Sequence, residues 1–390
     1  MKKKSALLLA AVLSAAAVFA VVAGCGSSTT PATSINDGVK NLSNVKSAHV
    51  DFNVSLAVNG NGSALGAQYK DLLPLNVTIG ASADVNGKDP KNPQAQGTIK
   101  IGGINQILST QTKSKNLNTQ QMQALTTIES ALGNLPFVFV GHDLFVSIGG
   151  NWYQTSSGSL LPSSGSSGHS TTVPGATSTS TGASTTSATT GTSTGTSTTA
   201  ALQGCFTNAF KDTSKFGADK VLKNLKDTGT VTINGTSTHH YTGDIDFSSL
   251  LTQVASTARD CGNSSIAAGI TAAKNQIGTV FKSGTVDFWI ASGNSIQQAQ
   301  LDLKLDPKAA ASLLGMLGGS LNSDAKTLNA LTLVELKMSV TLSHQNENFN
   351  ITKPQGNIQN LSTYIKSLGL GSPFGSSASS SGSGAAAPAG

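Results

Sequence analysis

Apolar and polar side chains alternate strictly along one stretch near the C-terminal end of the chain, from residue 334 to residue 343. The apolar members are Val334, Leu336, Met338, Val340 and Leu342, and between them lie Glu335, Lys337, Ser339, Thr341 and Ser343. A period of two residues places each set on its own face of a β-strand. One face of this strand is therefore expected to be buried, and the other to meet solvent.

The same alternation recurs in the N-terminal part of the chain. It runs through Val50, Phe52, Val54, Leu56 and Val58, and again through Leu75, Val77, Ile79, Ala81, Ala83 and Val85. Turn residues of the hairpin type follow at Asn86-Gly87, Asn234-Gly235 and Ser292-Gly293-Asn294. Because hairpins dominate and no strand-helix-strand rhythm recurs, we predict an α+β fold, in which an antiparallel sheet carries its helices on one face.

Shorter elements are expected around these strands. Further strands are predicted at residues 97–101, 137–140, 144–148, 230–233, 239–247, 284–290 and 295–305. Helices are predicted at residues 34–47, 119–132, 221–229, 248–258, 264–281, 307–317 and 358–368, where apolar residues recur at helical spacing. The pair Asp306-Pro307 supplies a cap and a first-turn proline for one of these helices.

The N-terminus has the pattern of an export signal. Three lysines, Lys2, Lys3 and Lys4, precede an uncharged run from Ser5 to Ala23. The sequence Val22-Ala23-Gly24-Cys25 then resembles the bacterial lipobox, which implies a signal peptide over residues 1–24, lipidation of Cys25 with acyl chains such as palmitate, and a tether over residues 25–34. Two alternatives are an uncleaved transmembrane anchor and a plain signal in which the cysteine is incidental.

Two low-complexity segments interrupt or follow the predicted elements. Residues 155–200 are rich in Ser, Thr and Gly, and residues 371–390 in Ser, Gly and Ala. Such segments contain too little apolar surface to form a core, so both are expected to be disordered. The first is either a flexible linker or a glycosylated spacer, and since loop closure becomes only slightly less favourable with length, it could interrupt a single domain.

Charge and cysteine content exclude some functions. Only 11 % of the residues are charged, and removal of the three N-terminal lysines reduces the formal charge from +6 to +3 (6 − 3). The chain contains a single arginine, Arg259, so nucleic acid is not expected as a partner. Once Cys25 is assigned to lipid, Cys205 and Cys261 remain as a pair in an exported protein, and we predict a disulfide between them. The alternative is a pair of buried free thiols.

Two linear motifs of metal and nucleotide sites are missing. The chain contains no H-E-x-x-H and no P-loop sequence. The neighbours His239 and His240 should point to opposite faces of a strand, so a shared metal ion is not expected. The carboxylates of Asp244 and Asp246 are interpreted as part of a solvated strand face. We therefore expect a protein that is not an enzyme and that has no cofactor and no metal.

Several short sequences resemble a known family. They are Gly149-Gly150-Asn151-Trp152-Tyr153, the segments Gly229 to Gly235 and His239 to Gly243, Val286-Asp287-Phe288-Trp289-Ile290 and Ile351-Thr352-Lys353-Pro354. Together they look like the mycobacterial LppX/LprG lipoproteins and, more distantly, the LolA/LolB lipoprotein carriers. The resemblance implies one domain over residues 35–370, in which an open, curved antiparallel half-barrel wraps over helices and encloses an apolar cavity for the acyl chains of a lipid or glycolipid.

The residues that would line such a cavity come from the alternating strands. We predict Phe52, Val54, Leu56, Val77, Ile79, Phe288, Leu336, Met338 and Val340 as lining residues. On periodicity alone they form a packed core. A low aromatic content (5 %) together with abundant Gly and Ala favours incomplete filling.

The expected function follows from the anchor and the cavity. It is a lipoprotein held on the extracytoplasmic face of the cell membrane that binds lipid or glycolipid for transport or assembly in the envelope. Its expected partners are the lipid ligand, the membrane and an envelope protein of unknown identity. The alternative is a non-enzymatic surface scaffold, adhesion protein or sensor with a filled core.

Overall fold

The computed structural model describes residues 30–65, 73–89, 91–103, 130–131, 133–156, 205, 216–316 and 327–367. The predicted signal peptide, the residue Cys25, the C-terminal tail, most of the predicted insertion and nearly all of the predicted helix at 119–132 lie outside these residues. Among the described helices, none combines the length and the apolar character that a membrane span requires.

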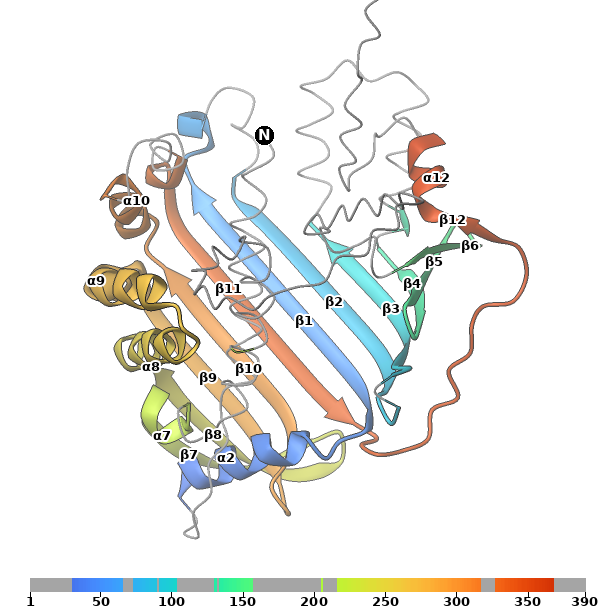
Figure 1. The fold of residues 1–390 in the computed structure, drawn as a ribbon, viewed down its shortest axis with the longest axis horizontal. Coiled ribbons are helices and arrows are strands. Elements are labelled where there is room, and N and C mark those ends of the chain that lie inside the picture. Colours follow the sequence, from blue (N-terminus) through green and yellow to red (C-terminus); the bar gives the residue numbers. More distant parts are fainter. Residues whose placement is uncertain are drawn as a thin grey trace, which may run out of the picture.

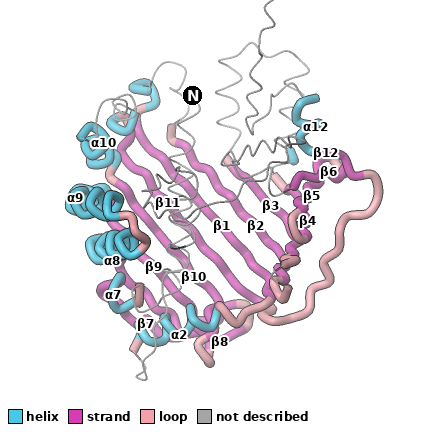
Figure 2. Tube along the Cα trace, in the orientation of Figure 1, coloured by secondary structure: helices cyan, strands magenta, loops and turns pink. Residues whose placement is uncertain are grey.

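One large open sheet organises the described residues (Figures 1 and 2). Its twelve strands follow the order β12-β6-β5-β4-β3-β2-β1-β11-β10-β9-β8-β7. The N-terminal strands are β1 (Ser47–Gly60), β2 (Leu75–Asn86), β3 (Gln94–Gly102), β4 (Leu135–Val140), β5 (Asp143–Ile148) and β6 (Asn151–Ser156). The C-terminal strands are β7 (Leu222–Ile233), β8 (Thr236–Ile245), β9 (Phe281–Ala291), β10 (Ser295–Leu305), β11 (Leu331–Ser343) and β12 (Ile358–Asn360).

The predicted α+β arrangement with an open curved sheet is confirmed, but the sheet is mixed and not purely antiparallel. Among the described strands, every pair is antiparallel except one. The short strand β12 runs parallel to β6 and pairs Ile358 with Trp152. The apolar period places residue 358 in the last helix, and this prediction is wrong. That helix, α12 (Leu361–Ser367), begins only after the strand, and the carboxamide oxygen of Asn360 accepts hydrogen bonds from its first amides.

The centre of the sheet joins the two halves of the sequence. Strand β1 pairs with β2 on one side and with β11 on the other, so that Phe52 lies opposite Ala81 and also opposite Val340. The two strands with the clearest alternation, β1 and β11, are thus direct neighbours. We call the face that carries Val54 and Met338 the inner face, and the opposite face the outer face.

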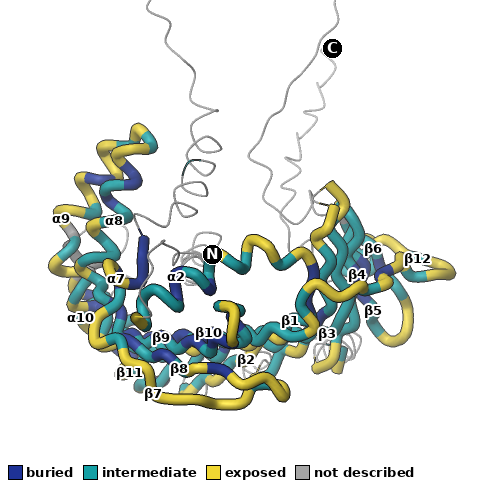
Figure 3. Tube along the Cα trace, turned by 90° about the horizontal axis from the view of Figure 1, so that it is seen from below, coloured by how far each residue is buried: buried dark blue, intermediate teal, exposed yellow. Residues whose placement is uncertain are grey.

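Small residues allow the sheet to bend where β3 meets its neighbours. Figure 3 shows the sheet turning upward towards β4, β5 and β6. Gly97 of β3 lies between Ala83 of β2 and Phe137 of β4. A Cβ atom on Gly97 would lie 2.0 Å from the carbonyl oxygen of Ser82 and 2.6 Å from the Cα of Ala83. The strands therefore approach more closely here than a side chain would permit.

Helix α2 (Pro31–Leu42) lies inside the bend, over β9 and β10 (Figure 3). It begins at Pro31, three residues earlier than predicted, because the hydroxyl of Thr30 accepts a hydrogen bond from the Thr33 amide and proline suits the first helical position. Its Ile35 is fully buried against the sheet. Gly38 permits this contact, since a Cβ there would lie 2.9 Å from Ile296 Cγ1.

The remaining described helices stand at the two margins of the sheet. Helices α7 (Ala218–Val221), α8 (Phe247–Asp260), α9 (Ser264–Val280) and α10 (Pro307–Met316) lie beside the half of the sheet that contains β7 to β11, and α12 lies at the opposite margin (Figure 1). A short 3-10 helix, η1 (Gly62–Leu65), follows β1. The prediction that all helices pack on one face of the sheet stays a prediction.

The helix predicted at residues 221–229 is wrong. Helix α7 ends at Val221, and residues 222–229 belong to the edge strand β7. Leu222 and Leu225 have helical spacing, but pairing with β8 prevails. The pairing shifts register twice, between Lys223 and Lys226 and between Asp227 and Thr230. Asn224 and Gly229, which lie in these two stretches, adopt positive φ angles of 53° and 107°. These irregularities shift the strand register, which hides the two-residue period from the sequence pattern.

Residues 344–357, which connect β11 to β12 in the chain, run along the outer face (Figure 2). We call this segment the strap. Its Phe349 and Ile351 pack with Val138 and Phe145, which the strand register places on the outer face. Lys353 of the strap donates a hydrogen bond of 2.8 Å to Asp143 Oδ2, and this bond holds the pKa of the Asp143 carboxyl below its usual value. The strap explains why the outer-face positions of β4, including Val138 and Val140, are apolar.

Gly97 generates the first testable prediction. Gly97→Ala should destabilise the fold by about 2 kcal/mol, since the added methyl group overlaps backbone atoms of β2. Gly80→Ala, on the neighbouring strand, is the matched control, because a Cβ there meets only the Phe52 carbonyl oxygen at 3.9 Å. Its effect should stay within about 0.5 kcal/mol. Urea unfolding of both variants measures the difference, and equal stabilities would contradict a close approach at Gly97.

The carboxylate of Asp246 generates a prediction about pH. Asp246 was expected on a strand beside Asp244, but it is the N-cap of α8 and accepts a hydrogen bond of 3.0 Å from the Ser249 amide. This bond lowers the pKa of Asp246 below 3.8. The ionised group therefore stabilises the folded state at pH values above 3.8, and this contribution is lost as the pH falls through the lowered pKa.

Asp246→Ala should accordingly reduce the free energy of unfolding by about 1 kcal/mol at pH 7. The difference from wild type should shrink when urea unfolding is repeated near pH 3. Asp246→Asn keeps an acceptor and serves as the control, with most of the stability retained and less dependence on pH. A difference between wild type and Asp246→Ala that is equal at both pH values would refute the role of the charge.

Candidate functional site

Strand register brings all the predicted lining residues onto the inner face. Opposite residues of adjacent antiparallel strands share a face, so each row across the sheet can be read from the pairing. One row contains Phe288, Ala299, Val340, Phe52, Ala81 and Ile99. The next contains Val286, Leu301, Met338, Val54, Ile79 and Ile101, and a third contains Leu303, Leu336, Leu56 and Val77.

The half of the inner face over β9, β10 and β11 is a packed core. Leu301 has an exposed fraction of 0 % and Met338 of 1 %, and both belong to the same buried cluster as Ile35 of α2. Among the predicted lining residues, Val54, Phe288, Leu336 and Met338 belong to this cluster, and Phe52 packs against it. These side chains contact protein, so the space around them is at least partly filled.

The inner face over β1, β2 and β3 is more open. Ile79 is 39 % exposed, although it lies in the same row as the fully buried Leu301. Its neighbours Ile101 on β3 and Val77 and Ala81 along β2 are only partly buried, whereas Val54 opposite it on β1 is buried. We call this region the open apolar band and define it by Leu56, Val77, Ile79, Ile99 and Ile101. A large apolar side chain exposed next to other apolar side chains is the kind of surface that binding partners cover.

A second covered region borders the open apolar band at its other side. Val146 and Tyr153 lie on the inner face of β5 and β6 and are 7 % and 4 % exposed. The ring of Tyr153 contacts that of Tyr364 from α12, with 4.4 Å between the ring centroids. Burial raises the pKa of the Tyr153 phenol. The open apolar band therefore lies between α2 on one side and α12 on the other.

The open apolar band carries no ionisable side chain. The inner-face positions of β1, β2 and β3 are Ala48, Val50, Phe52, Val54, Leu56, Val58, Leu75, Val77, Ile79, Ala81, Ala83, Val85, Ala95, Gly97, Ile99 and Ile101. This surface can offer a ligand only apolar burial, worth about 25 cal/mol per Å². It can therefore take hydrocarbon, and it has no group with which to recognise a charged headgroup.

Charged side chains lie on the outer face instead. Lys337 Nζ is 3.2 Å from Glu335 Oε1 and 3.7 Å from Asp302 Oδ2, and Lys304 Nζ is 3.6 Å from Glu335 Oε1. Hydrogen bonding to Glu335 raises the pKa of Lys337, and burial raises the pKa of Asp302. The two faces of the same strands thus have opposite chemical character.

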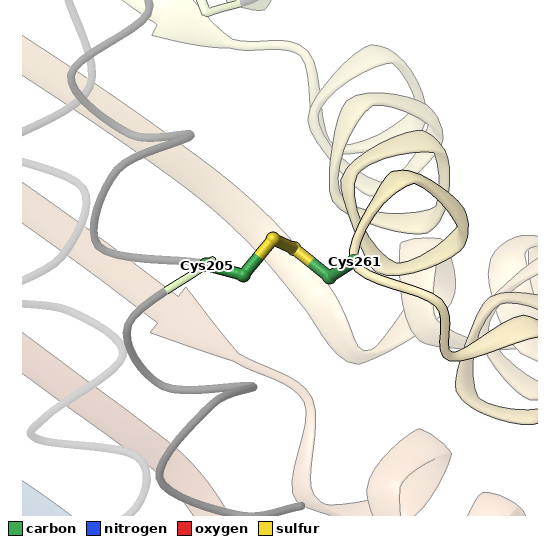
Figure 4. The surroundings of a disulfide bond; sticks show 2 residues. All are labelled: Cys205 and Cys261. Carbon is green, nitrogen blue, oxygen red and sulfur yellow. A yellow bond between two sulfur atoms is a disulfide. The ribbon is translucent and has the colours of Figure 1, made fainter.

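The predicted disulfide between Cys205 and Cys261 is present (Figure 4). The two Cα atoms are 5.7 Å apart, and the residues are separated by 56 positions in the chain. Cys261 is the C-cap of α8, directly after its last residue, so the bond ties this helix to the chain that follows the predicted insertion. Closing a loop of this length stabilises the folded state by roughly 4 kcal/mol in the chain-entropy model.

The two adjacent histidines point to opposite faces of β8, as expected. His239 Nδ1 is 3.1 Å from Asp227 Oδ2, whereas His240 Nε2 is 2.9 Å from Asp287 Oδ1. The ring of His240 also stacks on Trp289 with 4.4 Å between the centroids. In the part of the chain that the structure describes, no group of three or more His, Cys, Asp or Glu side chains is arranged to hold a metal ion.

Two residues of the open apolar band were missed in the sequence analysis, namely Ile99 and Ile101 of β3. The segment was predicted as a strand, and the alternation Gly97-Thr98-Ile99-Lys100-Ile101 is a usable signal. What the linear pattern lacks is the register, which places Ile101 directly opposite Ile79 and Ile99 opposite Ala81.

Comparisons with known proteins give similarity only to solved structures. No protein-family model matches the chain, and no curated protein matches it. The structure of lipoprotein LppX from Mycobacterium tuberculosis is similar over 83 % of this chain and 98 % of that one, with 15 % sequence identity and a TM-score of 0.33. LprF from Mycobacterium bovis is similar over 84 % of this chain and 99 % of that one, with 14 % identity and a TM-score of 0.35.

A protein of the DUF1329 family from Desulfovibrio piger is similar over 81 % of this chain and 93 % of that one, with 7 % identity and a TM-score of 0.17. LppX, whose family the sequence motifs resemble, is among the solved structures to which the chain is similar.

Proposed function

We propose that this protein is a lipid-binding lipoprotein that holds the acyl chains of a lipid or glycolipid on the open apolar band. The observation that carries the proposal is the change in exposure along one row of the inner face. Leu301, Met338 and Val54 are buried under protein, whereas Ile79 in the same row is 39 % exposed. The sheet presents a continuous apolar surface of which the described residues cover only a part.

Binding would rest on burial of hydrocarbon. Each methylene group removed from water contributes about 0.8 kcal/mol, so affinity depends on chain length more than on headgroup. The absence of ionisable side chains among Leu56, Val77, Ile79, Ile99 and Ile101 supports the same view. The ligand's polar end would remain outside the open apolar band.

The location of the protein rests on its N-terminal sequence. Lys2, Lys3 and Lys4, the apolar run and the lipobox-like residues before Cys25 support removal of residues 1–24 and lipidation of Cys25. A lipid anchor on the extracytoplasmic face of the cell membrane would place the open apolar band within reach of envelope lipids. We infer a role in their transport or assembly, over a single domain of residues 35–370.

A second candidate function is a surface scaffold, adhesion protein or sensor that binds no lipid. The observation that favours it is the packed half of the inner face, in which Leu301 and Met338 are almost fully buried. Under this hypothesis the exposed residues of β2 and β3 would have no ligand. Binding of a fatty acid distinguishes the two functions.

Ile79 provides the test. Ile79→Asn should weaken binding of the fluorescent fatty acid cis-parinaric acid about tenfold, because a polar amide replaces apolar contact in the centre of the open apolar band. Val231→Asn is the matched control, since Val231 is similarly exposed (41 %) but lies on the edge strand β7. Its dissociation constant should equal that of the wild type. Absence of binding by the wild-type chain, or equal affinities of all three proteins, would argue for the second function.

A further inference from the structure

A cluster of a hydroxyl, an imidazole and a carboxylate lies on the outer face, opposite the open apolar band. Asp84 of β2 is paired directly with His49 of β1, and Ser82 lies two residues before Asp84 on the same face. The oxygen Ser82 Oγ is 3.2 Å from His49 Nε2, and Asp84 Oδ1 is 2.7 Å from His49 Nδ1. Each partner therefore contacts a different ring nitrogen.

The hydrogen bonds assign the proton positions. A carboxylate only accepts, so His49 Nδ1 carries the proton that it donates to Asp84. The lone pair of Nε2 is then free to accept the hydroxyl proton of Ser82. A base next to the nucleophile, oriented by a third group on its far nitrogen, is the arrangement that activates a serine hydroxyl. The imidazole and the Asp84 carboxylate are about one-third exposed, so solvent molecules can reach them.

Space for a substrate lies next to Ser82. Gly80 is two residues away on the same face, and a Cβ built there meets only one atom, the Phe52 carbonyl oxygen, at 3.9 Å. The residues paired with Gly80 are Asn53 on β1 and Lys100 on β3. An amide and an ammonium group thus flank the free surface above Gly80, and both are groups that stabilise a developing oxyanion.

We propose that Ser82, His49 and Asp84 form an acyl-transfer site for exposed carboxylic esters. Ser82 Oγ would attack the ester carbonyl carbon while its proton passes to His49 Nε2. The bond to the leaving alkoxide breaks, and the alkoxide takes that proton. Water then attacks the acyl-Ser82 ester, gives a proton to His49, and releases the carboxylic acid as Ser82 Oγ recovers a proton.

Other titratable groups around His49 fit this role. Asp51 Oδ1 is 3.6 Å from His49 Nε2 and would stabilise the imidazolium that forms during each transfer. The ring of His344 contacts that of His49 edge-on at 6.5 Å between centroids and is itself hydrogen-bonded to Glu347. Because the cluster depends on strand register, no linear motif marks it, and the expectation of a non-enzyme rested on linear motifs alone. This inference is independent of lipid binding.

A fluorophosphonate probe tests the proposal on the full chain. It should label Ser82, as located by peptide mass spectrometry, and Ser82→Ala should abolish both the labelling and the hydrolysis of p-nitrophenyl acetate. Ser55→Ala is the matched control, because Ser55 lies on the outer face of β1 away from His49, and it should behave as wild type. Circular dichroism of each variant checks that the fold is retained.

Two further variants separate the roles within the cluster. His49→Gln should lower the hydrolysis rate by about 100-fold through loss of the general base. Asp84→Asn, at a positioning residue, should lower kcat while KM stays unchanged. The proposal is overturned if Ser82 is not labelled, or if Ser82→Ala hydrolyses the ester as fast as the wild type.

Discussion

The antiparallel pairing of β1 with β11 is the contact on which the rest of the structure depends. It joins strands separated by the greater part of the chain, and its register sets Val54 opposite Met338 and Leu56 opposite Leu336. Side chains alternate with a period of two, so a slip of one residue would send this apolar set to the outer face and the charged Glu335 and Lys337 to the inner face. The separation of the two faces therefore rests on one long, in-register pairing.

Because the sheet bends, the apolar residues of the inner face are not all covered to the same extent. On one side α2 fits closely over β9 and β10 because Gly38 allows the approach, and on the other side α12 packs against Tyr153. Between them, the rows of apolar residues continue over β1, β2 and β3 with less cover. A flat sheet under a single layer of helices would bury its rows uniformly. The difference between Leu301 and Ile79 within one row is thus a product of curvature and of where the helices lie.

The outer face is polar for the same reason that the inner face is apolar. Its charged groups are arranged in cross-strand contacts, such as Lys337 between Glu335 and Asp302. The strap covers the outer face near β4 and β5, where Val138 and Phe145 would otherwise be exposed. Further along the face, the side chains of His49 and Asp84 are about one-third exposed.

Much of the sheet could be predicted from the sequence, because a regular alternation of apolar and polar residues indicates a half-buried strand. The strands at 47–60, 75–86 and 331–343 follow the period closely, and the turns at Asn234-Gly235 and Gly293-Asn294 have the positive φ angles that their residues favour. The disulfide followed from counting cysteines in an exported chain. The first part of strand β7, residues 222–229, could not be predicted, because its irregular pairing breaks the period and leaves leucines at helical spacing.

Register is the information that the linear sequence lacks. Nothing in the residues around His49 or Asp84 shows that they face each other, and nothing around Ile101 shows that it lies beside Ile79. The parallel strand β12 is equally hidden, because its three residues precede a helix whose apolar period includes Ile358. Local pattern predicts which face a residue takes, whereas tertiary pairing decides which neighbours share that face.

Photo-crosslinking tests the central claim most directly. A fatty acid that carries a diazirine in its acyl chain would be bound to the purified chain and irradiated, and the labelled peptides would be mapped by mass spectrometry. The account predicts labels on the inner-face residues of β1, β2 and β3, between residues 47 and 102. Labels confined to β7 or α9, where Val231 and Ile266 are also exposed, or no label at all, would contradict it.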